Sequence, residues 1–276
     1  MKILIVGRPK TGTSMLAGKI KTGLDTHLNI NSQFLFEPRG EEWIEQIQEN
    51  NVTKVLYSRS PRHLSTVEDA IEVGKKFDKK VIICRDPRDT LISSTLYRWY
   101  HRHKPEAKYF RQVLELLLQK EKNPVSVNLY SISSISIRGG KSASLERYKA
   151  TIKNENNMFA DTASKLQHQN WYLVKYEDIV SKNHTELNKY LEFEISEDIS
   201  FQKKAFLRTA RSKTYGNWRN WFTEDDVIFF KPVFEECLEV LGYDTQDWEL
   251  NSEQQIDPST SSSYIIKLFQ GEGDYQ

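Results

Sequence analysis

The sequence predicts an α/β fold of three layers, in which a mainly parallel central sheet lies between two layers of helices. Two short apolar runs, residues 3–6 and 81–84, lack polar alternation, which is typical of strands covered on both faces of a parallel sheet. Each run is followed by a segment with helix-forming signals, and this alternation of strand and helix also indicates a parallel sheet. A chain of 276 residues is long enough to bury such a core.

The composition excludes several classes of function. Lys and Arg number 39 and Asp and Glu 38, a formal net charge of +1, so we expect no nucleic-acid partner and only a local anion site. No segment reaches the roughly 18–20 apolar residues that a membrane span requires. Cys84 and Cys237 are too far apart to indicate a metal site or a disulfide framework. We therefore expect a cytoplasmic protein without a metal ion.

The first strand is joined to the first helix by a glycine-containing loop, GRPKTGTS, at residues 7–14. The preceding apolar run is too short for the core of a signal peptide. The two glycines and the closing hydroxyl match the phosphate-binding pattern G-x-x-x-x-G-K-[ST], in which backbone N–H groups hold phosphate oxygens. The lysine has moved inside the loop, to Lys10, and Thr13 stands in its usual place. Because the usual lysine serves a metal-bound nucleoside triphosphate, this loop predicts a different anion.

The second strand runs directly into a strong helix start, RDPRDTLIS, at residues 85–93. Arg85 then stands at the carboxyl end of a strand, where open α/β sheets bind ligands. Ser93 lies on the flank of the helix, and a guanidinium with a hydroxyl suits a terminal phosphate. The alternative without a ligand is that Arg85 forms an ion pair on the protein surface. The expected N-cap, first helical residue and first-turn acid are Asp86, Pro87 and Asp89.

Two further motifs follow in the second half of the chain. Residues 211–223 read RSKTYGNWRNWFT, in which Thr223 is the expected N-cap of an acidic helix start. We expect Trp218 and Phe222 to pack in the core. The weaker motif is an apolar strand that ends in Tyr-Glu-Asp at residues 176–178.

Together these motifs resemble those of sulfotransferases, which use 3′-phosphoadenosine 5′-phosphosulfate (PAPS) as the sulfuryl donor. Residues 7–14 resemble the family's 5′-phosphosulfate loop, and residues 211–223 resemble its pattern R-K-G-x-x-G-D-W-K-N-x-F-T. Ser212 departs from that pattern, and Lys213 is expected to replace the missing charge. The resemblance implies a fold like that of P-loop nucleoside triphosphatases and a metal-independent transfer to an acceptor hydroxyl or amine.

The resemblance also implies roles for individual residues. Lys10 would stabilise the charge that develops on the leaving phosphate. Tyr176 would contact the adenosine. The 3′-phosphate would be held by Arg85, Ser93, Arg211 and Lys213. The 5′-phosphate would be held by Arg8, Lys10, Thr11, Gly12, Thr13 and Ser14.

An acceptor hydroxyl also needs a general base, for which there are two candidates. Glu37 lies in FLFEP, which resembles a segment of carbohydrate and tyrosylprotein sulfotransferases whose glutamate can act as base. His63 follows the predicted strand at residues 54–58 and resembles, more loosely, the catalytic histidine of the cytosolic small-molecule enzymes. Both residues remain candidates for the general base, and Glu37 is preferred.

We predict a sulfotransferase domain over residues 1–249 and a linker with a C-terminal tail over residues 250–276. Within the domain, residues 144–169 predict a long polar helix. Residues 125–137 are compatible with a β excursion or a loop over the acceptor, and we assign them no fixed structure. The expected partner is a small-molecule or glycan acceptor. Two other interpretations remain, namely a P-loop nucleotide kinase or nucleoside triphosphatase, and a phosphoadenosine-binding module without transfer activity.

Overall fold

The computed structural model describes residues 1–40, 42–60, 63–100, 106–138, 144–199 and 211–271. The chain divides into two compact units. Unit 1 comprises Met1–Arg85 and Phe159–Lys203, and unit 2 comprises Asp86–Met158 and Lys204–Gln276. The predicted α/β class is confirmed by unit 1, which holds the central sheet.

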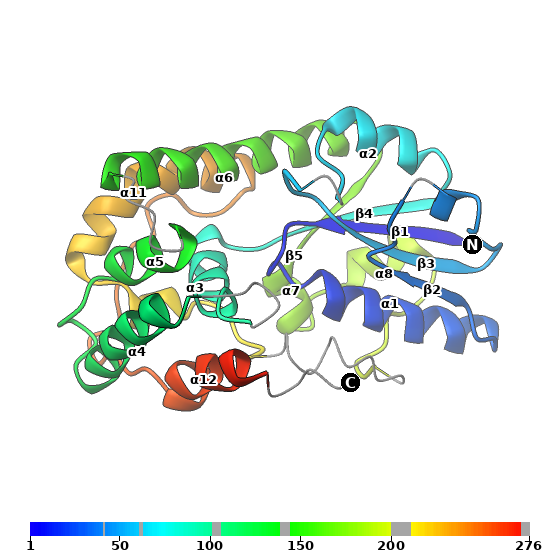
Figure 1. Ribbon diagram of the computed structural model, residues 1–276. Coiled ribbons are helices and arrows are strands. Elements are labelled where there is room, and N and C mark those ends of the chain that lie inside the picture. Colours follow the sequence, from blue (N-terminus) through cyan, green and yellow to red (C-terminus); the bar gives the residue numbers. More distant parts are fainter. Residues whose placement is uncertain (41, 61–62, 101–105, 139–143, 200–210, 272–276) are drawn as a thin grey trace. The chain divides into compact units, whose positions relative to one another are not determined.

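The sheet of unit 1 has five parallel strands in the order β2-β3-β1-β4-β5 (Figure 1). The two predicted apolar runs are neighbours in it, because Val6 of β1 pairs with Ile82 of β4. Residues 3–6 are 0 % exposed, as expected for a central strand covered on both faces. The strands are β1 (Lys2–Gly7), β2 (Gln33–Phe36), β3 (Asn51–Leu56), β4 (Lys79–Cys84) and β5 (Tyr172–Lys175).

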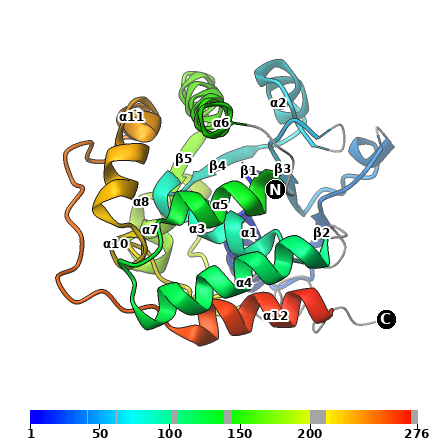
Figure 2. The same cartoon turned by 60° about the vertical axis from the view of Figure 1, so that its left-hand side comes forward.

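Helices cover both faces of this sheet (Figures 1 and 2). On one face lie α1 (Thr13–Leu28), α7 (Tyr176–Val180) and α8 (Thr185–Leu191), whose apolar side chains form one buried cluster with those of the sheet. On the other lie α2 (Val67–Gly74) and the C-terminal end of α6 (Leu145–Gln167). A short helix, η1 (Glu42–Ile44), follows β2. The predicted three-layer arrangement and the long polar helix are therefore both confirmed.

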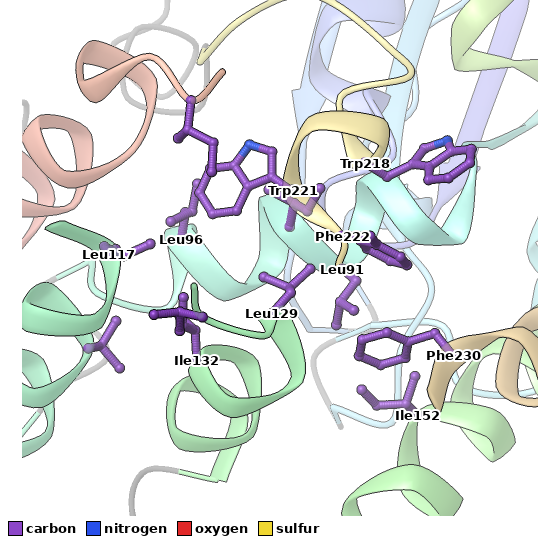
Figure 3. Close-up of a cluster of buried hydrophobic side chains, with 14 of the residues drawn as sticks. Leu91, Leu96, Leu117, Leu129, Ile132, Ile152, Trp218, Trp221, Phe222 and Phe230 are labelled. Carbon is purple, nitrogen blue, oxygen red and sulfur yellow. The ribbon is translucent and has the colours of Figure 1, made fainter. Parts of the chain in front are cut away.

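Unit 2 is helical in its described residues, and its largest buried cluster gathers side chains from several helices (Figure 3). Trp218 and Phe222 belong to this cluster and are 1 % and 0 % exposed, which confirms that they pack in the core. The helices are α3 (Pro87–Tyr97), α4 (Ala107–Lys122), α5 (Leu129–Arg138), the first part of α6, α10 (Trp218–Trp221), α11 (Glu224–Val240), η3 (Pro258–Thr260) and α12 (Ser262–Gln270).

Most of residues 125–137, to which the sequence analysis assigned no fixed structure, form helix α5, which is neither a β excursion nor a loop. Its serines suggested a β excursion or a loop, yet its buried residues recur at the spacing of one helix face. The N-terminus of α5 is capped from a distance: the Asp226 carboxylate accepts hydrogen bonds from the backbone N–H groups of Leu129 and Tyr130, at 2.7 and 2.9 Å. The buried face consists of Leu129, Ile132, Ser133 and Ser136.

The end of the chain packs into unit 2 as far as residue 271. Ile256 and Ile265 are 7 % and 0 % exposed and belong to its buried cluster, and the ring of Phe269 stacks on that of Phe110 at 3.9 Å. Residues 250–271 therefore contribute to a core, whereas the sequence suggested a linker and a tail. The extent of the sulfotransferase domain, residues 1–249, stays a prediction. No described helix is both long and apolar enough to cross a membrane.

Candidate functional site

The candidate residues of unit 1 lie at one edge of its sheet. Because all five strands are parallel, the residue that follows each strand emerges at the same edge. In the order of the sheet, these residues are Glu37 after β2, Ser58 and His63 after β3, residues 8–12 after β1, Arg85 after β4 and Tyr176 after β5.

The loop at residues 8–12 turns tightly between β1 and α1. The backbone N–H and the hydroxyl of Thr11 both donate to the carbonyl of Arg8, at 3.3 and 2.8 Å. Lys10 and Gly12 adopt left-handed backbone conformations, with φ of 73° and 92°. Gly12 is the N-cap of α1, so the first N–H groups and the positive dipole end of a 16-residue helix open onto this loop. The loop therefore has the features of a phosphate cradle.

Tyr176 and Arg85 pack against the cradle. The Arg85 guanidinium carbon lies 4.3 Å from the centre of the Tyr176 ring, and its Nη1 atom donates to the Lys10 carbonyl at 3.4 Å. Both side chains are buried, at 6 % exposure for Tyr176 and 7 % for Arg85. Three motifs that are far apart in the sequence thus meet through direct contacts within unit 1.

This packing requires glycine at position 12. A Cβ atom on Gly12 would lie 2.4 Å from Cδ2 of Tyr176, and its φ of 92° disfavours any other residue. We expect Gly12→Ala to lower the free energy of unfolding by about 1–3 kcal/mol and to weaken adenosine 3′,5′-bisphosphate binding at least tenfold. Thermal unfolding and calorimetry measure the two effects.

Gly40→Ala is the matched control for that substitution. Gly40 has a similar φ of 79°, but nothing lies within 4 Å of a Cβ atom there. The control should lose some stability from its backbone and should keep nucleotide affinity. Equal losses of affinity in both variants would contradict the role of the Tyr176 contact.

Glu37 is engaged in an ion pair at the site edge. Its carboxylate binds the ammonium group of Lys54, which is 2 % exposed and lies 4.4 Å from the centre of the Phe36 ring. The Glu37 N–H also donates to the Lys54 carbonyl at 2.8 Å, and its φ of 49° is left-handed. The carboxylate is therefore the counter-ion of a buried cation, a structural role that competes with its predicted use as a base.

His63 lies closer to the cradle in the order of the sheet. Its Nδ1 atom is 2.6 Å from Oγ of Ser58, and this hydroxyl also accepts the N–H of Ser60 at 3.2 Å. The strand before it, β3, is adjacent to β1, and the Tyr57 N–H donates to the Gly7 carbonyl at 3.0 Å. Since neighbouring strands are about 5 Å apart, β2 with Glu37 ends roughly 10 Å from β1.

Unit 2 carries the remaining predicted residues, and Asp89 links two of its motifs. Ser93 is 7 % exposed on α3, one turn after Asp89. The buried Asp89 carboxylate accepts the backbone N–H groups of Gly216 and Trp218, at 2.6 and 3.0 Å. The motif at residues 211–223 is therefore bound to the helix that carries Ser93.

The two basic residues of that motif differ in their surroundings. Nη1 of Arg211 donates to the carbonyl of Thr260, at 3.3 Å. Lys213 is exposed, with a left-handed φ of 51°. Arg219, which matches a basic position of the family pattern, instead pairs with Asp247.

Sequence reasoning missed two charged residues that shape these sites. Lys54 lies in β3 between β-branched residues, Thr53 and Val55, and a lysine within such a strand was a signal that it needs a partner. Asp89 was predicted only as an acid of the first helical turn, and nothing local indicates that it binds a segment over 120 residues later.

Comparison with known families decides between the interpretations of the phosphate loop. The family model of the sulfotransferase domain matches residues 1–203, well over half of the chain. The chain belongs to the sulfotransferase family. It is therefore a transferase that moves sulfuryl groups, and the kinase interpretation is set aside. No curated protein matches the sequence. The match ends before residues 211–223, so the roles of Arg211 and Lys213 stay predictions.

Proposed function

We propose that this sulfotransferase moves a sulfuryl group from PAPS to an acceptor hydroxyl or amine, without a metal ion. The observation that carries the proposal is the β1–α1 cradle with Lys10 inside it and with Tyr176 and Arg85 packed against it. PAPS supplies an activated sulfuryl group on its 5′-phosphate, with adenosine 3′,5′-bisphosphate as the leaving group.

The residues of the cradle suit a 5′-phosphosulfate. Backbone N–H groups of residues 11–14 and the hydroxyls of Thr13 and Ser14 would hold the phosphate oxygens. The absence of a side chain at Gly12 lets the Tyr176 ring pack directly against the backbone of the loop. Arg8 adds a positive charge at the start of the loop, where its guanidinium lies 6.0 Å from the Phe159 ring centre. The tyrosine ring would contact the adenosine.

Lys10 would act on the bond that breaks. Negative charge grows on the bridging oxygen of the leaving phosphate, and a fixed ammonium group there stabilises the transition state more than the ground state. Its left-handed backbone belongs to the tight turn that holds it inside the loop. This is why we assign catalysis to Lys10 as well as binding.

We propose His63, with Glu37 as the alternative, for the general base. Two observations support this order: Glu37 faces the buried Lys54 ammonium, and β3 is the strand adjacent to β1. A hydrogen bond from Nδ1–H of His63 to Oγ of Ser58 would leave Nε2 able to accept the acceptor's proton.

The assignment of the 3′-phosphate follows the family resemblance. The residues that this resemblance assigns to it are Arg85, Ser93, Arg211 and Lys213. The acceptor would be a small molecule or a glycan, and the sparse use of cysteine favours a cytoplasmic location.

A calorimetric titration tests the proposed donor. We expect adenosine 3′,5′-bisphosphate to bind tightly with or without a divalent metal, and ATP with Mg²⁺ to bind at least a hundredfold more weakly, because the loop lacks the lysine that serves a metal-bound triphosphate. Addition of EDTA should leave the first affinity unchanged. The reverse preference, or binding that requires the metal, would overturn PAPS as the donor.

A further inference from the structure

The C-terminal segment of residues 251–260 is hydrogen-bonded to the motif at residues 211–223. The side-chain amide of Gln254 makes the central contact: its Nε2 atom donates to the carbonyls of Arg219 and Phe222, at 2.8 and 2.7 Å. Arg219 lies within α10, and Phe222 is the residue that caps its C-terminus. One side chain of the C-terminal segment thus binds both α10 and its cap residue.

Further bonds connect the same two segments. The Asn251 N–H donates to the Arg219 carbonyl at 3.2 Å, and its Nδ2 atom donates to Oδ1 of Asn220 at 2.8 Å. The backbone N–H of Gln255 donates to the same Asn220 oxygen at 3.3 Å. At the other end, the carbonyl of Thr260 accepts the Arg211 guanidinium at 3.3 Å. The contacts therefore extend from Arg211 to Phe222.

The C-terminal segment is itself anchored, so it can act as a fixed support. Ile256 in its middle and Ile265 just after it are buried in the core of unit 2. On α3, Asp89 binds the motif at Gly216 and Trp218. The motif is thus held by two supports, while Lys213 stays exposed to solvent.

We propose that residues 251–260 hold the motif at residues 211–223 in place, with Gln254 as a positioning residue for Arg211 and Lys213, which are assigned to the 3′-phosphate. This inference rests on the proposed function. Gln254 would not touch the nucleotide. It acts by fixing the backbone of the motif, because a basic loop that is already ordered loses less conformational entropy when it binds an anion.

The inference predicts a loss that is specific for the 3′-phosphate. Gln254→Ala removes both amide hydrogen bonds, so the affinity for adenosine 3′,5′-bisphosphate should fall about tenfold. The affinity for 5′-AMP, which lacks the 3′-phosphate, should stay within twofold of the wild type. A purely structural defect would lower both affinities together.

The experiment compares calorimetric affinities for these two nucleotides in the full chain. Gln246→Ala is the matched control, since Gln246 is exposed and its side-chain amide contacts only the adjacent Thr245 among the bonds described. Asn251→Ala is a milder second variant, because Asn251 is exposed, and its specific loss should be about threefold.

The outcomes separate the two proposals. A specific loss in Gln254→Ala and Asn251→Ala, with none in Gln246→Ala, supports the inference. Unchanged discrimination, or equal losses for both nucleotides, overturns it and leaves the proposed function intact. A wild-type protein that binds neither nucleotide overturns the proposed function and this inference with it.

Discussion

Lys10→Ala is expected to lower kcat about 100- to 1,000-fold while the affinity for adenosine 3′,5′-bisphosphate falls less than tenfold. The rate should fall more than the affinity because the ammonium group neutralises a negative charge that is small in the bound donor and large in the transition state. Alanine, like lysine, has a Cβ atom, so the left-handed backbone at this position bears no new type of strain. Labelled PAPS in single-turnover assays measures the transfer rate, and calorimetry measures the affinity.

Two variants control for the length and the charge of the side chain. Lys10→Met keeps an unbranched chain of similar length without a charge and should behave like alanine. Lys10→Arg keeps a cation with a different reach and should retain part of the rate. A turnover that stays at the wild-type value in Lys10→Met would remove Lys10 from the catalytic assignment.

The central strands could be predicted because their signal is local. A strand buried on both faces must be apolar throughout, so residues 3–6 and 81–84 are recognisable from their side chains alone. Residues 125–137 carry no such continuous apolar signal, because Ser133 and Ser136 are among their buried residues. Serine is found at turns and in helices alike, and the apolar spacing of Leu129 and Ile132 was the better signal for α5.

Residues of the site could be predicted only where their positions follow from the order of strands and loops along the chain. Arg85 and Tyr176 each follow a strand of a parallel sheet, so their arrival at the edge of β1 is a consequence of topology. The pairing of Glu37 with Lys54 depends on the register of β2 against β3, in which Phe36 lies opposite Lys54. No local pattern in the sequence specifies that register.

The C-terminal segment shows how polar composition misleads. Residues 251–263 contain serine, glutamine and aspartate in the proportions of a linker. The amides of Gln254 and Asn251 instead bind backbone carbonyls and a side-chain oxygen of another segment. Such partners are distant in sequence, and the buried Ile256 was the apolar residue within this stretch that indicated packing.

His63→Ala is expected to lower kcat about 100- to 10,000-fold and to remove the acidic limb of the pH–rate profile. In the wild type, the rate should rise with pH over this limb, because a protonated imidazole cannot accept the proton of the acceptor hydroxyl. Without the imidazole that titration no longer governs the rate, so the residual activity should be flat in the same range. The profile is measured at saturating PAPS with a common acceptor for all variants.

Glu37→Gln should affect stability more than the shape of this profile. Its loss leaves the Lys54 ammonium without the facing carboxylate, which we expect to cost roughly 1–3 kcal/mol in the free energy of unfolding. Adding Lys54→Met removes the buried charge and should recover stability and most of the activity, because a structural counter-ion is no longer needed. If Glu37 is instead the base, the double variant stays inactive and Glu37→Gln, rather than His63→Ala, abolishes the acidic limb.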